Sequence, residues 1–430
     1  MRRPLLAAAV AIGVGAALLQ LPAAPTAASD LPAVQERHLA VIERIGHIDA
    51  LAAEQHLGAV TGDPLAGWIE VGWSGEVPAE VQQVADAAAA EGIDVRFVPA
   101  AASAADIADV AASFAASLPA EGAFGLQLGA EGITVEVPTA DAAAAGGSEA
   151  IPLDDAGVQD AIADARADAA ALGVDLVVEE TEELPLSTAS TIDPVGRAPV
   201  QTARTDDTTV FSGGMRVMTQ FRSGAFVSCT SGFSGVYGHR PMILTAAHCS
   251  DYRDGRAVRN YSGTRVGTSE LVATLNDGAY ATDLGAIALD YDARTLPRIY
   301  TGQTSTLAIT SAMTTRPPAG YYLCSSGQVT GWKCDLRSGD SYVACYSSVA
   351  GQECVNVILV TSSAGRAFCL GDSGGPVVTH PNAEGATAVA VVSGIRGTPV
   401  GGCGPTGLIA PVSDLYGMVF GAQLHTTPLG

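Results

Sequence analysis

The chain has 430 residues, 48% hydrophobic and 16% charged, enough apolar material for two or three packed domains. Its formal charge of -23 is unevenly spread: residues 30–206 carry 31 acidic and 6 basic side chains, whereas residues 207–430 carry 14 of each. We call these the acidic region and the neutral region. Neither is basic, which argues against nucleic-acid binding. All eight cysteines lie between Cys229 and Cys403, so the two regions are expected to fold separately.

The first residues have the pattern of a secretory signal peptide. Arg2 and Arg3 give a positive start, residues 5–21 form an apolar run, and Ala27 and Ala28 precede the expected cut. The run is short for a transmembrane helix, so we expect export without a stable membrane anchor. An even number of cysteines in an exported chain predicts disulfides and a secreted, extracellular location.

The acidic region alternates between helical and strand-like patterns. Apolar spacing predicts helices over 31–56, 81–90, 104–118 and 155–172, and strands over 66–73, 93–98, 124–128, 133–137 and 174–178. This is an α+β pattern with two similar halves. Residues 180–208 then lose periodicity and gather glutamates and prolines, which predicts an exposed linker that proteases can reach. Beyond it, short β-type runs between glycine-rich turns predict an all-β barrel or sandwich.

The segment GDSGGP, from Gly371 to Pro376, is the strongest chemical pattern in the chain. A serine hydroxyl becomes a good nucleophile when a base takes its proton, and the oxyanion that forms needs N–H donors aimed at it. The glycine two residues before the serine lets the backbone curl so that two N–H groups converge. We therefore predict that Ser373 is a catalytic nucleophile rather than part of an ordinary glycine-rich turn.

Two further segments supply the base and the acid that such a serine needs. The segment LTAAHC contains His248, whose imidazole can accept the serine proton near neutral pH and return it to the leaving group. The segment TDLGAI places Asp283 directly before an apolar run, where its carboxylate can hold the imidazole in one tautomer. Rival aspartates, which lie beside turn-like or polar residues, are Asp277, Asp290 and Asp292.

In this order, the three segments resemble the chymotrypsin-like serine proteases. The segment CSSGQVTGWKC, from Cys324 to Cys334, further resembles a loop of the bacterial streptogrisin and α-lytic protease group. FSGG, CTSGF and APV, which start at Phe211, Cys229 and Ala410, resemble other parts of that group. The resemblance implies a signal peptide at 1–28, an α+β pro-region at 29–208, and an all-β protease domain of two antiparallel β-barrels at 209–430.

The resemblance also assigns roles to residues beyond the triad. The backbone N–H groups of Gly371 and Ser373 would be the oxyanion donors. Ser393 matches the serine that helps hold the triad aspartate, and Ser393, Gly394 and Ile395 would form the edge on which the substrate backbone pairs as an extra strand. The implied disulfides are Cys229–Cys249, Cys324–Cys334 and Cys369–Cys403, which leaves Cys345 and Cys354 to pair with each other.

Two features depart from that group. In the α-lytic group an arginine beside the first cysteine of the loop pairs with the aspartate before the nucleophile. Here that neighbour is Ser325. The partner of Asp372 could therefore be another arginine or the amino terminus left by processing. Ala367, the substrate-binding position six residues before the nucleophile, is neutral. This argues against a preference for basic side chains, because a buried carboxylate would be needed to pair with them. We predict cleavage after hydrophobic or aromatic side chains.

The sequence thus predicts a secreted serine endopeptidase that cleaves proteins or peptides as a monomer, without a cofactor or a metal. The pro-region is expected to assist folding and to cover the active site, as an intramolecular chaperone and inhibitor, until a cut between Thr202 and Gly213. One alternative is a secreted esterase, whose GxSxG turn is similar but whose order is Ser, acid, His. The other is a non-catalytic binding protein on a protease scaffold. Asp251 and Asp254 could help bind calcium but are expected to be solvated.

Overall fold

A computed structural model gives the structure of the protein. It describes residues 30–48, 55–118, 124–129, 132–141, 153–182, 187–188, 191–193, 204, 207, 210–221, 226–237, 240–250, 255–270, 282–290, 294–348, 351–397, 400–418 and 422–427. The expected signal peptide lies outside these residues, as do Asp251, Asp254, Asp277 and Asp292. None of the described helices has both the length and the apolar character needed to cross a membrane.

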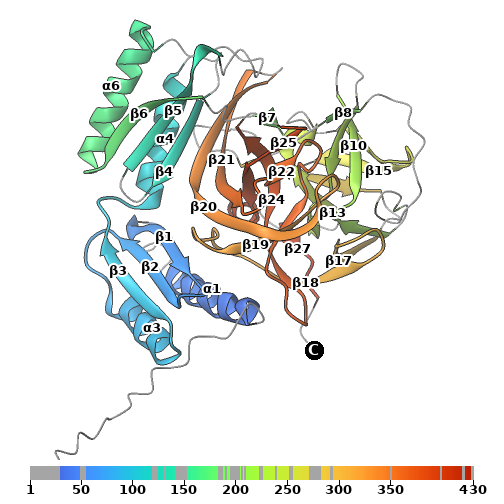
Figure 1. Ribbon diagram of the computed structural model, residues 1–430, viewed down its shortest axis with the longest axis horizontal. Coiled ribbons are helices and arrows are strands. Elements are labelled where there is room, and N and C mark those ends of the chain that lie inside the picture. The colour runs from blue at the N-terminus through green and yellow to red at the C-terminus, as the bar shows by residue number, and fades with distance from the viewer. Residues whose placement is uncertain are drawn as a thin grey trace, which may run out of the picture.

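The acidic region consists of two halves with the same order of elements (Figure 1). Each half has a helix, an antiparallel strand pair, a second helix, and a last strand parallel to the second strand of the pair. The α+β prediction is therefore confirmed. The first half comprises α1 (Leu31–His47), β1 (Leu57–Asp63), β2 (Trp68–Trp73), α3 (Ala79–Ala90) and β3 (Asp94–Pro99). The second comprises α4 (Ala104–Ser117), β4 (Phe124–Gly129), β5 (Gly132–Pro138), α6 (Ala156–Ala171) and β6 (Asp175–Thr181).

One prediction in the first half was wrong in detail, and one strand was missed. The helix expected over 31–56 ends at His47, and residues 57–63 form a strand that the sequence pattern did not reveal. This strand, LGAVTGD, contains two glycines and lacks a regular alternation of buried and partly buried positions, so it gives no period-2 signal. Its place is decided by pairing with β2 instead.

The neutral region begins with a sheet of short strands around its own apolar core. The described core residues include Val217, Val227, Ile243 and Ile287. The strands of this sheet, in spatial order, are β27 (Ala422–Leu424), β12 (Ser234–Tyr237), β13 (Arg240–Ala246), β16 (Leu284–Leu289), β15 (Arg265–Glu270), β14 (Ala257–Asn260), β10 (Arg216–Gln220), β11 (Phe226–Thr230) and, from the acidic region, β8 (Thr191–Asp193).

The second sheet of the neutral region closes on itself as an antiparallel barrel. Its ring runs through β19 (Tyr322–Gly327), β20 (Gly331–Ser348), β21 (Gly351–Ser362), β26 (Thr406–Pro411), β24 (Ala386–Arg396) and β23 (Pro376–Thr379), and β23 pairs with β19 again. The remaining elements of the neutral region are β9 (Val210–Gly213), β17 (Arg294–Tyr300), β18 (Thr306–Ala312), β22 (Phe368–Cys369), β25 (Cys403–Gly404), η1 (Ala247–Ser250) and α8 (Ser413–Met418), and β7 (Ser187–Thr188) comes from the acidic region. The prediction of an all-β domain after an α+β region is confirmed.

The acidic region is joined to the barrel through a shared sheet. Strand β4 pairs antiparallel with β20, so that β6, β5, β4 and β20 form one continuous sheet (Figure 1). Helix α1 adds a second contact, since Gln35 Nε2 donates to the carbonyl of Tyr322 at 2.8 Å. The expected exposed linker is contradicted at three places, because Arg204 is 6% exposed, β7 pairs with β24, and β8 pairs with β11.

Candidate active site

Strand pairing brings His248 and Asp283 together. Strand β13 pairs with β16 so that Ala246 lies opposite Leu284. His248 follows the end of β13 by two residues, and Asp283 immediately precedes β16. In antiparallel strands the end of one lies beside the beginning of the other, so the two side chains start from neighbouring backbone positions. The backbone N–H of His248 also donates to Asp283 Oδ1 at 3.0 Å, which holds the carboxylate against the turn.

The three residues expected as a triad form one chain of contacts. His248 Nδ1 lies 2.7 Å from Asp283 Oδ2, and His248 Nε2 lies 2.8 Å from Ser373 Oγ. The hydroxyl of Ser393 donates to the same Asp283 oxygen at 2.7 Å. All four side chains are buried. Such an arrangement lets the imidazole accept the serine proton while the carboxylate stabilises the resulting cation.

The turn that carries Ser373 depends on its glycines. Gly374 has a φ of +81°, and a Cβ there would lie 2.1 Å from Thr245 Oγ1. The carbonyl of Gly371 accepts hydrogen bonds from Thr230 Oγ1 at 2.9 Å and from Gln328 Nε2 at 2.8 Å, so its orientation is held. Among the described residues, nothing accepts a hydrogen bond from the backbone N–H of Gly371 or of Ser373. These two groups can therefore donate to an oxyanion.

The carboxylate of Asp372, directly before the nucleophile, is fully buried and is held by backbone N–H groups. Oδ1 accepts from Val329 at 2.8 Å and from Thr330 at 3.1 Å, and Oδ2 accepts from Cys369 at 2.9 Å. Burial raises the pKa of Asp372, and these N–H groups oppose that rise. The three N–H groups are thus part of the partner set of Asp372, which the sequence left open because Ser325 replaces the arginine of the α-lytic group.

The nearby cation is Arg204, which the sequence analysis did not single out. Its Nε donates to the carbonyl of Gly214 at 2.8 Å, and its Nη2 donates to Ser326 Oγ at 2.9 Å and to the carbonyl of Gly327 at 2.6 Å. Burial lowers the pKa of Arg204, and the charge of Asp372 opposes this. No motif marks Arg204, because it lies alone in an aperiodic segment. The one feature of the sequence that pointed to such an arginine was that Asp372 lacked the partner found in the α-lytic group.

The expected substrate edge is already paired within this chain. Strand β7 lies antiparallel to β24, with Thr188 opposite Gly394 and Ser187 opposite Ile395. Strand β8 pairs antiparallel with β11, over Phe226 to Ser228. Both edges adjoin the nucleophile turn, since the N–H of Thr230, the last residue of β11, donates to the carbonyl of Ser373 at 2.7 Å, and the N–H of Gly374 donates to the carbonyl of Val392 in β24 at 2.7 Å.

Ala367 is the residue that the sequence analysis expects to bind substrate. It is fully buried and belongs to a cluster that includes Phe368 and Ile395. Its carbonyl accepts a hydrogen bond from Lys333 Nζ at 3.2 Å, and Lys333 pairs with Asp335 at 3.1 Å. The charge beside this wall is thus an ion pair of Lys333 with Asp335. Of the rival aspartates, Asp290 is described and pairs with Arg265 on the surface, away from His248.

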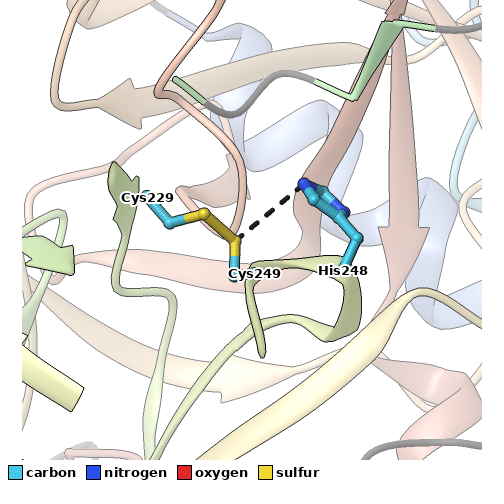
Figure 2. Close-up of side chains that lie close together, drawn as sticks. All are labelled: Cys229, His248 and Cys249. Carbon is cyan, nitrogen blue, oxygen red and sulfur yellow. Dashed lines mark hydrogen bonds between the residues drawn. A yellow bond between two sulfur atoms is a disulfide. The ribbon is translucent and has the colours of Figure 1, made fainter. Parts of the chain in front are cut away.

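All eight cysteines form disulfides. Figure 2 shows how Cys229, at β11, is joined to Cys249 beside His248, so that this bond ties the histidine turn to the first sheet. His248 and the two sulfurs lie close enough to suggest a metal site, as do His380, Cys324 and Cys334. Sulfurs in a disulfide offer no thiolate for a metal, so neither group is a metal site. The four bonds are Cys229–Cys249, Cys324–Cys334, Cys345–Cys354 and Cys369–Cys403.

Comparisons with known proteins identify the neutral region. Residues 207–418 match the model of the family described as Trypsin. Similar solved structures include Thermobifida fusca protease A, at 24% identity over 51% of this chain and 100% of that chain, with a TM-score of 0.36. Cellulomonas bogoriensis chymotrypsin is 22% identical over 51% of this chain and 100% of that chain, with a TM-score of 0.34. An alpha-lytic protease homolog, N4, is 24% identical over 50% of this chain and 100% of that chain, with a TM-score of 0.38. No curated protein matches.

The fold and the family match define a serine peptidase of the chymotrypsin-like class. Residues 207–418 belong to the trypsin family, and the acidic region precedes this domain in the chain.

Proposed function

We propose that this chain is the secreted precursor of a serine endopeptidase whose catalytic residues are His248, Asp283 and Ser373. The observation that carries the proposal is the chain of hydrogen-bond contacts from Asp283 through His248 to Ser373 Oγ, within a trypsin-family domain. The apolar amino terminus and the four disulfides support secretion. Partners are protein or peptide substrates, and the enzyme acts as a monomer.

The geometry supports acyl transfer in two steps. His248 Nε2 takes the proton of Ser373 as Oγ attacks the substrate carbonyl, and Asp283 stabilises the imidazolium. The N–H groups of Gly371 and Ser373 donate to the oxyanion of the tetrahedral intermediate. His248 then gives its proton to the leaving amine, so that the peptide bond breaks and an acyl-enzyme remains. Water attacks the ester by the same route, which releases the acid and restores Ser373.

A fluorophosphonate probe tests this proposal directly. The processed protein should be labelled once, at Ser373, and labelling should disappear in Ser373→Ala. The matched control is Ser363→Ala, which alters a serine in an exposed turn. Hydrolysis of casein must fall together with labelling. If Ser373→Ala retains casein hydrolysis, the assignment of the nucleophile is wrong. If labelled protein cleaves a simple ester but no peptide, the esterase alternative is favoured, although its α/β-hydrolase fold differs from the antiparallel barrel found here.

The acidic region is proposed to cover the active site. Strands β7 and β8 occupy backbone edges on the two sides of the nucleophile turn. Thr188 and Thr191 are three residues apart, which limits their separation to about 11 Å. The chain that links the two regions therefore uses the hydrogen-bonding groups that an extended substrate would need. This supports inhibition of the precursor by its own segment.

The acidic region is also proposed to assist folding. Its contribution to the β4–β20 pairing and to the packing of α1 on the barrel supports this role. The test is to refold residues 209–430 alone and together with residues 30–206 supplied in trans. Activity should be recovered only in the second case. Equal recovery in both cases would remove the folding role and leave the region as an inhibitor or a passive spacer.

The domain boundary and the cut can be proposed more narrowly from the contacts. The sequence places the boundary at 208/209 and the cut between Thr202 and Gly213. Arg204 is buried against the trypsin-family domain, and the Asp207 carboxylate accepts a hydrogen bond from Tyr300 Oη at 2.7 Å. These contacts with the domain support a cut before Arg204. Amino-terminal sequencing of the secreted enzyme decides, and a first residue after 204 would refute it.

Cleavage is proposed to follow hydrophobic side chains. The support is the apolar cluster around Ala367 and Ile395. Ala367 offers no carboxylate, which a buried arginine or lysine side chain of the substrate would need as a partner. A peptide-library profile dominated by cuts after arginine or lysine would contradict this preference.

A further inference from the structure

A carboxylate of the acidic region reaches the end of the substrate edge. Glu136 lies on β5 and is 7% exposed. Its Oε1 lies 2.5 Å from Nη2 of Arg396, and its Oε2 accepts a hydrogen bond from the hydroxyl of Tyr342 at 2.9 Å. Both oxygens are thus held by side chains of the trypsin-family domain. The Arg396 guanidinium also lies 5.7 Å from the centre of the Tyr342 ring, so the two groups support each other's positions.

Arg396 follows directly on the residues that pair with β7. Ser187 lies opposite Ile395, and Arg396 is the next and last residue of β24. A chain bound in this antiparallel register would place its preceding residue, one step towards its amino terminus, opposite Arg396. Directly opposed residues of antiparallel strands point to the same face of the sheet, with their Cβ atoms about 5 Å apart. A side chain at that substrate position can therefore reach the guanidinium.

We propose that Arg396 and Tyr342 form a subsite for an acidic side chain of the substrate, on the amino-terminal side of the scissile bond, and that Glu136 occupies this subsite in the precursor. The proposal rests on the proposed function, because the subsite opens only when the acidic region leaves. Removal of Glu136 takes away the carboxylate that both groups hold. A glutamate or aspartate of the substrate can replace it, since a planar guanidinium and a hydroxyl match the two oxygens of a carboxylate.

The packing around Tyr342 explains how the strand pair of β4 and β5 brings Glu136 into this subsite in the precursor. Gly125 of β4 lies directly against the Tyr342 hydroxyl, and a Cβ at Gly125 would lie 1.6 Å from that oxygen. The tyrosine hydroxyl is therefore held between the backbone of β4 and the carboxylate from β5. A larger side chain at 125 would push the strand pair away and separate Glu136 from Arg396.

Paired peptides test the subsite in the processed enzyme. The set carries glutamate or glutamine at each of the four positions before the scissile bond, and is otherwise identical. We expect the glutamate peptide to have a kcat/KM about tenfold above its glutamine counterpart at the position opposite Arg396, as for a hydrogen bond to a charged group. The ratio should fall to about one in Arg396→Met and stay above one in Arg396→Lys. High salt should reduce it in the wild type.

The outcomes separate the subsite from the proposed function. Equal cleavage of every glutamate and glutamine pair by the wild type would overturn the subsite while leaving the endopeptidase intact. Absence of all peptide cleavage would overturn both. A second measurement uses the full precursor, in which Glu136→Gln should speed the appearance of active enzyme, with Glu179→Gln, an exposed position on β6, as the control. Identical rates for the two variants would show that Glu136 does not occupy the subsite.

Discussion

Replacement of Arg204 by methionine tests whether this residue belongs to the enzyme rather than to the part removed. Methionine keeps most of the volume of the stem but lacks the guanidinium. The change leaves the carbonyls of Gly214 and Gly327 and the hydroxyl of Ser326 without this donor, and leaves Asp372 buried without its neighbouring cation. Since Arg204 is 6% exposed, solvent cannot replace these contacts.

The expected loss of stability is about 3 kcal/mol, because three buried acceptors lose a donor and each acceptor left unsatisfied costs about 1–3 kcal/mol. The assay is urea unfolding of the processed enzyme after inactivation with a fluorophosphonate, followed through the fluorescence of Trp332, the single tryptophan of the neutral region. Arg204→Lys retains a charge but cannot donate in the same three directions, so it should lose less than the methionine variant.

Arg298→Met is the matched control. Arg298 is exposed and its guanidinium makes one long contact, to Thr306 Oγ1 at 3.4 Å, so the change should stay within about 0.5 kcal/mol. If Arg204→Met also stays within that range, Arg204 does not support the domain, and the proposed cut before it loses its basis. The mass of the processed wild-type enzyme tests the position of the cut independently, because it shows whether Arg204 is retained.

Three further predictions follow from single contacts. Burial, aided by the charge of Arg37, lowers the pKa of His38 to about 4. The contribution of His38 to the stability of the precursor should therefore be full above pH 6.5 and fall as the pH drops towards 4. His38→Gln should reduce this pH dependence. Ser393→Ala removes a hydrogen bond to the triad carboxylate and should lower kcat about tenfold. Replacing Cys345 and Cys354 by serine opens a short loop and should lower the free energy of unfolding by about 2–3 kcal/mol.

Each of these has a control or a contrary outcome. His47 is exposed, so His47→Gln should leave the pH dependence of the precursor unchanged. An unchanged kcat in Ser393→Ala, with normal folding by circular dichroism, would mean that the serine does not position the carboxylate. The double serine variant is compared with the oxidised wild type, and an equal urea midpoint in the two proteins would exclude a stabilising role for the Cys345–Cys354 disulfide.

The sequence by itself indicated those parts of the structure that depend on neighbouring residues. The segment around Ser373 needs glycines where the backbone takes a positive φ, and Gly374 leaves no space for a Cβ, so the motif is readable without a fold. The helices of the acidic region were visible because a buried stripe requires apolar residues at a fixed spacing. Strand β1 was missed because its residues carry no such spacing.

Tertiary structure alone decided the contacts between distant segments. Arg204 reaches Ser326 across 122 residues, and Glu136 reaches Arg396 across 260. Such pairs leave no periodic trace, since each depends on where the backbone places two single side chains. The pairing of β4 with β20 belongs to the same class, because strand edges offer identical backbone donors and acceptors, and only the packing of side chains selects the partner.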